Sequence, residues 1–472
     1  MKLHNSLTNT TDEFNLQNNL ISIYSCGPTV YDNLHIGNLS AFIYADLLRR
    51  VLKATYPDAE IKHVMNITDV DDKTIRDSKI RYPDEDPMKA LLTFTRHYED
   101  VFMKDSALVG NDLEAFSFIR ATDSIPEMQA LITELHSQGI AYITEDGVYF
   151  SIEAYQKTGK VYGQLVELEK STDTKSRIAN DEYEKDSAND FALWKLEKNG
   201  EPSWAYSLGG QKLDGRPGWH IECSAMSRKL LGEQFDIHTG GIDLKFPHHE
   251  NEIAQSTACT ESSVMAKFFV HNDHVLVDGV KMSKSLGNFY TLRDVEEKGY
   301  NPIAFRLLVL QGHYSNSVNF SWDNLEAAQK RLHRWKRLSA RRWQISGQVS
   351  SENIGDVVAI KNSILLEVQD DLRAPQSFTH IEMLMDLVEQ SIMGAEGSKA
   401  FTQVLDLVDA IFGLNLVATT PNISDEQKTM IEDLKKARTT KDYDTADVLK
   451  NSLYDQGIEL SIGADETIWN WK

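Results

Sequence analysis

The pattern of apolar and polar positions predicts alternating strands and helices in the first part of the chain. Residues 20–26, LISIYSC, form a short apolar run typical of a buried strand. Residues 39–54, LSAFIYADLLRRVLKA, repeat apolar side chains at intervals of three and four, which predicts a helix. Residues 60–68, EIKHVMNIT, predict a second strand. Residues 69–81 begin another helix, with acids at its N-terminal end, where the helix dipole favours them.

This order of elements predicts an α/β fold built on a doubly wound parallel sheet. Such sheets bind their ligands at the carboxyl ends of the strands. Cys26 and the pair Thr68–Asp69 fall at two of these ends. We therefore expect a ligand site at that edge of the sheet.

The rest of the chain changes character twice. Residues 164–190 are polar and acidic, which indicates a connection within a domain-sized insertion. We expect sheet-like character to resume near GRPGWHIECSAM, residues 215–226, and FDIHTGGIDL, residues 235–244. After about residue 300 the pattern is mostly helical, and a break near residue 416 opens a last small unit.

Composition narrows the class of protein. The 472 residues are 41% hydrophobic and 25% charged, which is typical of a globular protein with several domains. No apolar run approaches the roughly 18–20 residues needed to cross a bilayer, and the first residues lack the apolar core of a signal peptide. We therefore expect a cytoplasmic protein without a membrane partner. The three cysteines do not make a disulfide framework, and a net charge of −22 disfavours indiscriminate nucleic-acid binding.

The tetrapeptide His35–Asn38, HIGN, is the first candidate for chemistry. It follows a predicted strand and opens a helix, whose free amide groups and dipole attract phosphate. Gly37 would let a ligand approach the backbone closely. An ordinary loop is the other interpretation of so short a motif.

The pentapeptide KMSKS, residues 281–285, is the second candidate. Its two lysines, Lys281 and Lys284, stand between serines and shortly before a glycine, as in a mobile loop that closes over a polyphosphate. Their charge would offset the charge that develops when a phosphorus atom is attacked. The alternative is a solvated turn.

Two thiols and the stretch FPHHENE form the third candidate. Cys26 and Cys223 could join an imidazole and the carboxylate of Glu252 in a tetrahedral zinc site. His248 lies four residues before Glu252 and His249 three, so helical spacing does not choose between them. The alternative is a pair of buried cysteines beside an unrelated helix-surface pair.

The fourth candidate is the basic stretch KRLHRWKRLSARRW, residues 330–343. It contains seven basic residues and two tryptophans without an acid, which suits contact with RNA phosphate. A solvated helix face with its tryptophans in a core explains the pattern equally well.

Longer blocks of sequence resemble one family. These blocks are CGPTVYDNLHIGN, NITDVDDK, GRPGWHIECSAM, DIHTGGIDLKFPHHENEIAQS, KMSKSLGNF and HYSNSVNFS. In this order they resemble the cysteinyl-tRNA synthetases, a family of class I aminoacyl-tRNA synthetases. The likeness is looser beyond about residue 322 but extends to the C-terminal stretch KKARTTKDYDTADVLKNSLYDQGIEL.

The resemblance implies a Rossmann-type fold and a division of the chain into domains. The expected domains are the first half of the nucleotide-binding domain (1–117), a connective insertion (118–212), the second half (213–245), a stem-contact region with the KMSKS loop (246–322), a helical bundle (323–415) and an anticodon-binding domain (416–472). We expect a monomer.

The resemblance also implies the site residues. One Zn²⁺ per chain would be held by Cys26, Cys223, His248 and Glu252. A substrate cysteine can bind zinc as its thiolate, whereas the hydroxyl of serine is a poorer ligand, so that the metal itself would select cysteine. The residues expected beside the bound cysteine are Thr68, Trp219 and Asp243.

The remaining implied residues contact ATP and tRNA. ATP, accompanied by Mg²⁺, would meet His35, Gly37, Asn38, His238, Gly240, Gly241 and Lys284, with His35, Lys281 and Lys284 acting in catalysis. Asn38 stands where the class motif has histidine, and it cannot carry a charge. The residues expected to contact tRNA(Cys) are Arg334, Lys336, Arg337, Arg438 and Trp469.

The implied reaction activates L-cysteine with ATP to cysteinyl-adenylate and transfers it to tRNA(Cys). Three alternatives differ in what the sequence should contain. A ligase that joins the same adenylate to an amino sugar would not need the C-terminal unit. A non-catalytic nucleotide- or RNA-binding relative should have lost motif residues, and a nucleotidylyltransferase that shares only the His-x-Gly motif usually lacks the paired thiols.

Overall fold

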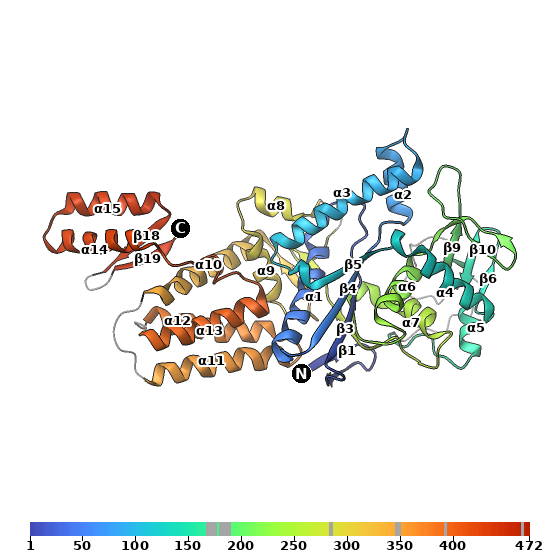
Figure 1. Ribbon diagram of the computed structural model, residues 1–472, viewed down its shortest axis with the longest axis horizontal. Helices are drawn as coiled ribbons and strands as arrows, with labels where there is room; N and C mark the ends of the chain where they lie inside the picture. The colour runs from blue at the N-terminus through green and yellow to red at the C-terminus, as the bar shows by residue number, and fades with distance from the viewer. Residues whose placement is uncertain (167–176, 179–189, 283–286, 345–350, 391–393, 464–466) are drawn as a thin grey trace. The chain divides into compact units, whose positions relative to one another are not determined.

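The chain forms two compact units. The computed structural model describes residues 1–166, 177–178, 190–282, 287–344, 351–390, 394–463 and 467–472 (Figure 1). The first unit comprises Met1–Lys298 with His313–Phe320, and the second comprises Gly299–Gly312 with Ser321–Lys472.

A five-stranded parallel sheet forms the centre of the first unit (Figure 1). Its strands, in spatial order, are β14 (Ala266–Asn272), β13 (Phe235–Gly241), β3 (Leu20–Ser25), β4 (Glu60–Ile67) and β5 (Phe116–Arg120). Ile23 of β3 pairs with Ile237 on one side and with His63 on the other. The predicted doubly wound parallel sheet is confirmed.

Helices connect these strands and begin where the sequence supplies caps. They are α1 (Ile36–Thr55), α2 (Asp72–Arg81), α3 (Pro87–Leu108), α6 (Trp219–Leu231) and α7 (Glu250–Thr257). The side chains of Asp71 and Thr74 exchange hydrogen bonds with each other's backbone amides at the start of α2, which satisfies two amides that a helix leaves free.

The expectation of sheet-like character through residues 215–226 is wrong for most of that stretch. β12 covers only Gly215–Pro217, and α6 begins at Trp219. Residues Ile221 and Ala225 are four apart and both buried, so they share the face of α6 that packs inward. This matters for the site because Cys223 lies on that helix rather than on a strand.

The insertion carries a second sheet. Its antiparallel strands, in spatial order, are β12, β9 (Asp190–Leu196), β7 (Gly147–Phe150) and β6 (Ala141–Ile143), and β8 (Arg177–Ile178) pairs with β9. The other elements here are α4 (Ile125–Ser137), α5 (Ile152–Lys157), β10 (Ser207–Leu208) and β11 (Gln211–Lys212). Most of the acidic stretch 164–190 lies outside the described residues.

Two details differ from the expected limits of the insertion. β5 of the central sheet runs across the expected boundary after residue 117. β12 pairs with β9 of the inserted sheet although it follows residue 212. Both strands are short, and their pairing partners lie far away in sequence, so local pattern does not assign them to a sheet.

The first unit is completed by smaller elements around the central sheet. These are β1 (Lys2–Asn5), β2 (Thr10–Glu13), β15 (Val275–Val277), β16 (Val280–Lys281), α8 (Leu292–Glu297) and β17 (Val318–Phe320). β15 pairs with both β16 and β17, so the residues just before the KMSKS serines belong to a small three-stranded sheet.

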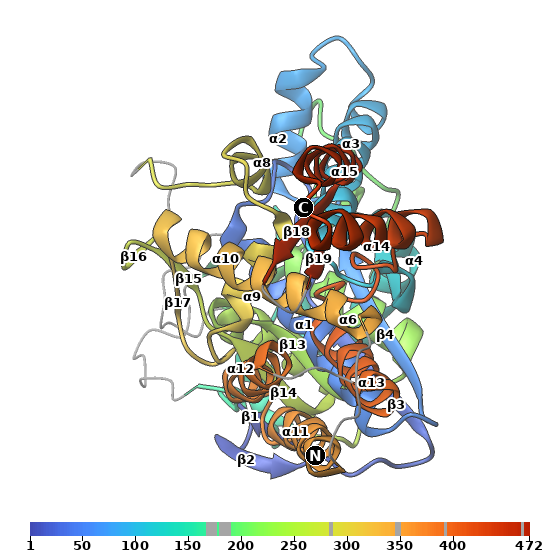
Figure 2. The same cartoon turned by 90° about the vertical axis from the view of Figure 1, so that its left-hand side faces the viewer.

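The second unit is mostly helical, as predicted. Its elements are α9 (Pro302–Leu310), α10 (Trp322–Ser339), α11 (Ser351–Gln369), α12 (Ala374–Gln390), α13 (Ala395–Phe412), α14 (Asp425–Thr439), α15 (Tyr443–Asp455), β18 (Ile458–Ile462) and β19 (Thr467–Trp471). Helices α11, α12 and α13 pack side by side (Figure 2). The hairpin β18–β19 packs with α14 and α15 around a small core of its own.

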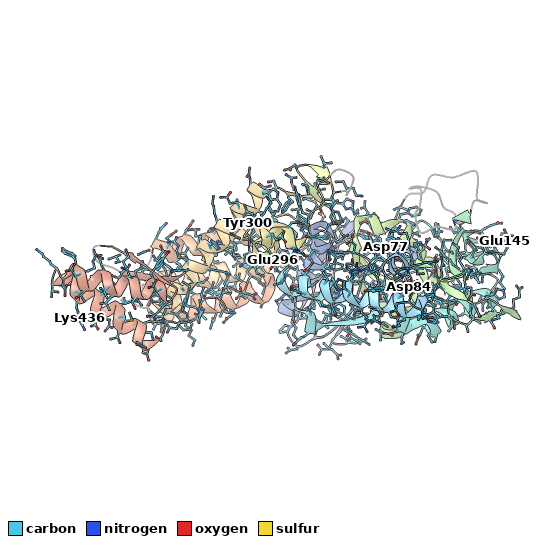
Figure 3. The ribbon with its side chains drawn as sticks, turned by 90° about the horizontal axis from the view of Figure 1, so that it is seen from above. Asp77, Asp84, Glu145, Glu296, Tyr300 and Lys436 are labelled. Atoms are coloured by element: carbon cyan, nitrogen blue, oxygen red, sulfur yellow. The ribbon has the colours of Figure 1, made fainter. Side chains whose placement is uncertain are left out.

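Charged side chains mark the surfaces of both units. Figure 3 labels Asp77 on α2, Asp84 in the turn after it and Glu145 in the β6–β7 turn of the first unit, and Lys436 on α14 of the second. Within the described ranges, the chain has no helix of the length and apolar character that a membrane span requires.

Candidate functional site

A cavity of about 510 Å³ opens at the carboxyl ends of the central strands. Its wall comes from the loop after β3, the start of α1, the turns after β13 and β14, and the end of β16. The predicted site residues on this wall are Cys26, His35, Gly37, Asn38, Trp219, Gly241, Asp243 and Lys281. Local motifs that lie far apart in sequence therefore do meet at one edge of the sheet.

The start of α1 has the form that the HIGN motif predicts. His35 is the N-cap, and its Nδ1 accepts a hydrogen bond from the Asn38 backbone amide at 3.1 Å. A Cβ on Gly37 would lie 2.4 Å from Met282 Cε and 2.9 Å from the His35 ring. A larger residue at position 37 would therefore displace the Met282 side chain and crowd the His35 ring. Lys281 lies on the cavity wall, whereas Lys284, with Ser283 and Ser285, lies outside the described residues.

The structure brings together the four side chains that the resemblance implies as metal ligands. One ligand atom each from Cys26, Cys223, His248 and Glu252 lies within 4.8 Å of the others; we call these residues the metal cluster. Glu252 Oε1 lies 3.0 Å from His248 Nε2 and 3.7 Å from Cys26 Sγ. Ligand atoms at the corners of a tetrahedron stand about 3.4–3.8 Å apart when the bonds are about 2.1–2.3 Å long. The distance from Glu252 to Cys26 lies in this range and that from Glu252 to His248 is shorter, so the four atoms are close enough to share one small ion such as zinc.

The sheet edge fixes Cys26 through its backbone. Its amide donates to the Thr239 carbonyl of β13 at 3.0 Å, and the next amide, of Gly27, donates to Asn66 Oδ1 at 2.8 Å. A Cβ on Gly27 would stand 1.7 Å from the Asn66 carbonyl oxygen. The loop after β3 can therefore pass this close to β4 only because residue 27 is glycine.

The other ligands lie on helical segments and are buried. Cys223 lies on α6 and Glu252 on α7, while His248 lies in the turn Lys245–His249 just before α7. Each is at most 1% exposed. Of the four, Cys26 is the one on the cavity wall, so a molecule in the cavity would meet the metal cluster at the Cys26 side.

Three members of the metal cluster carry the charges of a ligand set, whereas burial and then the hydrogen bond with Cys223 raise the pKa of Cys26 well above its usual value, so this thiol would lose its proton when a cation binds. Burial raises the pKa of Glu252, but His238 and His248 lower it to about 2, so it is a carboxylate. Burial raises the pKa of Cys223, but the hydrogen bond with Cys26 and the charge of His248 lower it to about 6. Burial lowers the pKa of His248, but Glu252 and Cys223 raise it to about 10. A thiolate and a carboxylate thus share one proton with His248, and a cation would replace that proton.

A second set of four ligand atoms overlaps the first. Cys26, His238, His249 and Glu252 also come within 4.8 Å of one another. His249 Nε2 lies 3.3 Å from Cys26 Sγ, but its Nδ1 is held by His271 Nε2 at 2.8 Å. His238 Nε2 lies 2.9 Å from Glu252 Oε2. The first set has two thiols rather than one, which suits zinc better, and leaves His238 to orient Glu252.

Two predicted positions differ from the expectation. His238 does not line the cavity: it is fully buried, between the Tyr24 carbonyl and Glu252. Thr68 is also absent from the wall; it is 1% exposed and donates to Glu222 Oε2 at 3.0 Å. Asn66 in turn donates to Thr68. Both residues form buried hydrogen bonds around the cavity and are not part of its surface.

Trp219 and Asp243 do reach the wall. The Trp219 ring stacks on His248 of the metal cluster, with ring centroids 4.1 Å apart at 22°. Asp243 lies in the exposed 3₁₀ turn Ile242–Leu244. At Gly240, an added Cβ would stand 2.9 Å from the His249 ring. The absence of a side chain at residue 240 thus accommodates the packing of a histidine rather than a nucleotide.

Tyr31 and Lys73 are among the wall residues that sequence analysis missed. The Lys73 amino group stands 5.3 Å from the centre of the Tyr31 ring. Tyr31 lies between Cys26 and His35, and Lys73 ends the block NITDVDDK. Both residues lie inside blocks that resemble the family, and this position could have identified them as site residues.

The basic stretch of α10 is neutralised within its own unit. Arg331, Arg334 and Arg337, which we call the basic row, face α12. Arg334 donates to Glu382 at 2.7 Å, to Asp386 at 2.5 Å and to Glu389 at 2.7 Å, and Arg337 also donates to Glu389 at 2.7 Å.

Two tryptophans of the second unit, Trp335 and Trp469, are buried. Trp335 is 0% exposed and Trp469 is 5% exposed, each within an apolar core. Stacking of the Trp469 ring on an unpaired base, as expected from sequence, would require this core to open. Lys336 is half-buried, which lowers its pKa, whereas Arg438 on α14 is exposed.

Comparison with known proteins agrees with the blocks seen in the sequence. The family model "tRNA synthetases class I (C) catalytic domain" matches residues 13–330. The cysteine–tRNA ligase of Leptospira interrogans serogroup Icterohaemorrhagiae serovar copenhageni is 37% identical over 485 residues, which cover 100% of this chain and 99% of that protein. The cysteine–tRNA ligase of Brachyspira hyodysenteriae is 38% identical over 486 residues, which cover 99% of this chain and 99% of that protein.

Solved structures with the same fold are more distant in sequence. A ternary complex of an Agrobacterium radiobacter K84 LeuRS with tRNA and LeuAMS has a TM-score of 0.59 at 11% identity, over 86% of this chain and 85% of that one. Mycobacterium tuberculosis methionyl-tRNA synthetase, bound by methionyl-adenylate, has a TM-score of 0.57 at 12% identity, over 88% of this chain and 94% of that one.

Proposed function

The chain belongs to the cysteine–tRNA ligase family of class I tRNA synthetases, and we propose that it activates L-cysteine with ATP and transfers it to tRNA(Cys). The observation that carries the proposal is the placement of the metal cluster. Two thiols, an imidazole and a carboxylate converge behind the cavity that also contains the start of α1, and Cys26 brings the set to the cavity wall. A class I nucleotide motif and a thiol-binding group thus face one space.

We propose that the metal is zinc and that the metal cluster holds it. The donor atoms fit in type and in spacing, and the pKa values of Cys223 and Glu252 lie below neutral pH, as ligands require. The ion would bind the substrate cysteine through its thiolate and so reject serine. His238 would keep the Glu252 carboxylate oriented toward the ion.

The residues around the cavity would position the two substrates. The His35 ring and the N-terminal end of α1 would border the phosphates of ATP, with the Asn38 side chain as a neutral donor beside them. Lys281 and Lys284 would neutralise the charge that develops as pyrophosphate leaves, and Mg²⁺ would accompany ATP. Trp219 and Asp243 would border the amino acid, Trp219 with its ring against His248.

The chemistry needs no covalent enzyme intermediate. The cysteine carboxylate attacks the α-phosphorus of ATP, giving cysteinyl-adenylate and pyrophosphate. A ribose hydroxyl of the terminal adenosine of tRNA then attacks the activated carbonyl and releases AMP. Holding both reacting groups in one enclosed cavity is the main contribution of the chain.

The roles of the domains are proposed from the family resemblance and the elements that each part contains. The inserted sheet would be the connective domain, the small sheet of β15, β16 and β17 would belong to the stem-contact region, and α14, α15 and the final hairpin would read the anticodon. Arg438 and Arg337 are both exposed tRNA candidates, but Arg337, like Arg334, would first have to leave the carboxylates of α12. We expect the enzyme to act as a monomer in the cytoplasm.

Cysteine-dependent exchange of pyrophosphate into ATP, followed by charging of purified tRNA(Cys), tests the proposal. We expect both reactions with cysteine and neither with serine. Exchange without charging would favour the amino-sugar ligase, and absence of exchange would favour a non-catalytic binding protein. A nucleotidylyltransferase would not depend on cysteine.

A further inference from the structure

The residues that follow the KMSKS motif pack against the HIGN motif at the start of α1. His35 forms an isolated antiparallel bridge with Thr291, and the Ile36 amide donates to the Tyr290 carbonyl at 2.8 Å. This amide belongs to the first turn of α1, where a helix leaves its amides without intrahelical partners. The chain after the KMSKS motif is therefore joined to the helix end that the proposed function places beside ATP.

Phe289 comes directly before Tyr290 in this segment, and its ring meets the imidazole of His35. The two ring centroids are 4.9 Å apart and the ring planes stand at 76°, an edge-to-face arrangement. Aromatic rings favour this geometry because the positive edge of one ring meets the negative face of the other. Phe289 is half-buried, and both residues line the cavity. The Phe289 ring thus contacts the imidazole that the proposed function assigns to the phosphates.

The backbone around Phe289 is held on both sides. On its N-terminal side, the Asn288 side-chain amide donates to the Lys281 carbonyl at the end of β16 at 3.2 Å. On its C-terminal side, Thr291 and Asp294 exchange hydrogen bonds in a capping box at the start of α8. The fold therefore restricts where the ring of Phe289 can lie.

The surroundings of His35 define both its tautomer and its orientation. Its Nδ1 accepts from the Asn38 amide at 3.1 Å, and a ring nitrogen that accepts carries no proton, so the ring proton is on Nε2. This hydrogen bond alone would restrain the imidazole only weakly, because rotation about χ2 has broad minima. The ring also lies against Gly37, where an added Cβ would stand 2.9 Å from it, and against Phe289.

We propose that Phe289 is a positioning residue for ATP, whose ring keeps the His35 imidazole turned so that Nδ1 stays on the Asn38 amide and Nε2 donates to a phosphate oxygen. This inference rests on the proposed function, because that function places His35 beside the phosphates. Phe289 acts through His35, since its own ring offers no hydrogen-bonding group. Without the ring, the imidazole would turn or change its tautomer, and the phosphates would lose a donor that is oriented in advance.

Nitrogen NMR of the histidine side chains in the full-length protein tests the contact itself. Spectra are recorded at about pH 8, above the ordinary histidine pKa, and the His35 signals are identified by their loss in His35→Asn. We expect the Nε2-protonated tautomer in the wild type and in Phe289→Tyr, which keeps the ring, and a mixture of tautomers in Phe289→Leu. An unchanged His35 signal in Phe289→Leu would overturn the proposal.

Phe118→Leu is the matched control for this experiment. Phe118 is also half-buried and makes an edge-to-face pair, with Phe102 at 6.2 Å and 82°, but it does not line the cavity. Its replacement should leave the His35 signals as in the wild type. A change of the His35 tautomer in Phe118→Leu as large as that in Phe289→Leu would mean that general loosening of the fold causes it, and would overturn the proposal.

Calorimetric titration of ATP and Mg²⁺, without cysteine, tests the consequence for binding. Phe289→Leu should raise the dissociation constant of ATP about two- to tenfold, the contribution of one aromatic pair. In a His35→Asn background, the same change should have an effect of less than about twofold. An equal rise in both backgrounds would mean that the ring contacts ATP directly, and would overturn the proposal. Neither result depends on cysteine-dependent exchange, so absence of exchange would count against the proposed function alone.

Discussion

The metal cluster and the basic row are both groups of charged or reactive side chains, but their surroundings are opposite. In the metal cluster, two thiols, an imidazole and a carboxylate bring their ligand atoms within 4.8 Å of one another and could together hold a cation. In the basic row, each arginine already has a carboxylate of α12 as its partner. A cluster thus indicates a ligand site only where the rest of the fold leaves its charge unmatched.

Removal of a ligand from the metal cluster should have the largest effect. Cys223→Ser replaces a thiolate with a hydroxyl that remains protonated, so the set loses a charge. We expect bound zinc to be lost and cysteine-dependent pyrophosphate exchange to fall by at least about a hundredfold. Mutation of a residue that only hydrogen-bonds to a metal ligand typically costs about ten- to a hundredfold in metal affinity or activity, and loss of a ligand itself should cost more. Metal analysis and exchange assays measure this. Cys259→Ser, outside the metal cluster, is the matched control and should behave as the wild type.

Disruption of the support behind the metal cluster should have the next largest effect. His238→Phe keeps an aromatic ring among Tyr24, Phe235 and Phe269 but leaves Glu252 Oε2 without its partner. Zinc affinity, measured by competition with a chelator, should fall about ten- to a hundredfold. The control, His63→Phe, removes another buried imidazole and should keep the affinity. An unchanged affinity in His238→Phe would contradict this supporting role, whereas loss of binding in both His238→Phe and His249→Phe would favour the second set of ligands, which contains both histidines.

Arginines that form ion pairs and arginines that do not should contribute differently to the binding of tRNA. Arg438→Ala removes an exposed charge and should raise KM for tRNA(Cys) about fivefold, the equivalent of one charged contact of about 1 kcal/mol. Arg334→Gln removes a charge that three carboxylates already match, and should change KM less than about twofold. Pyrophosphate exchange should be unaffected in either variant. A larger effect of Arg334→Gln would mean that the basic row opens to bind RNA.

The smallest effect concerns stability at low pH. The hydrogen bond from Arg334, and then that from Arg337, lower the pKa of Glu389. An acid with a lowered folded-state pKa stabilises the fold above its unfolded pKa and loses that contribution as the pH falls through the folded value. Glu389→Gln should therefore lower the free energy of unfolding by less than about 1 kcal/mol at pH 7. Denaturant titrations should show that this difference disappears near pH 3; a difference that persists there would contradict the ion-pair account.

Sequence patterns predicted the central sheet and the residues that meet at its edge because both depend on local features. The apolar run before Cys26 ends where β3 ends, and the HIGN motif begins α1. Spacing allowed either His248 or His249 to share a face with Glu252, and the family resemblance selected His248, which lies 3.0 Å from Glu252. What the pattern could not predict depends on partners distant in sequence. The burial of His238 requires β13 to pair with β3, and the neutralisation of Arg334 requires α12 to lie beside α10.

X-ray absorption at the zinc edge, with and without L-cysteine, tests the central claim most directly. The protein as purified should contain zinc with two sulfur ligands, from Cys26 and Cys223, and the addition of L-cysteine, but not of L-serine, should add a third. An unchanged zinc environment with L-cysteine present, or a protein that binds no zinc, would contradict the account.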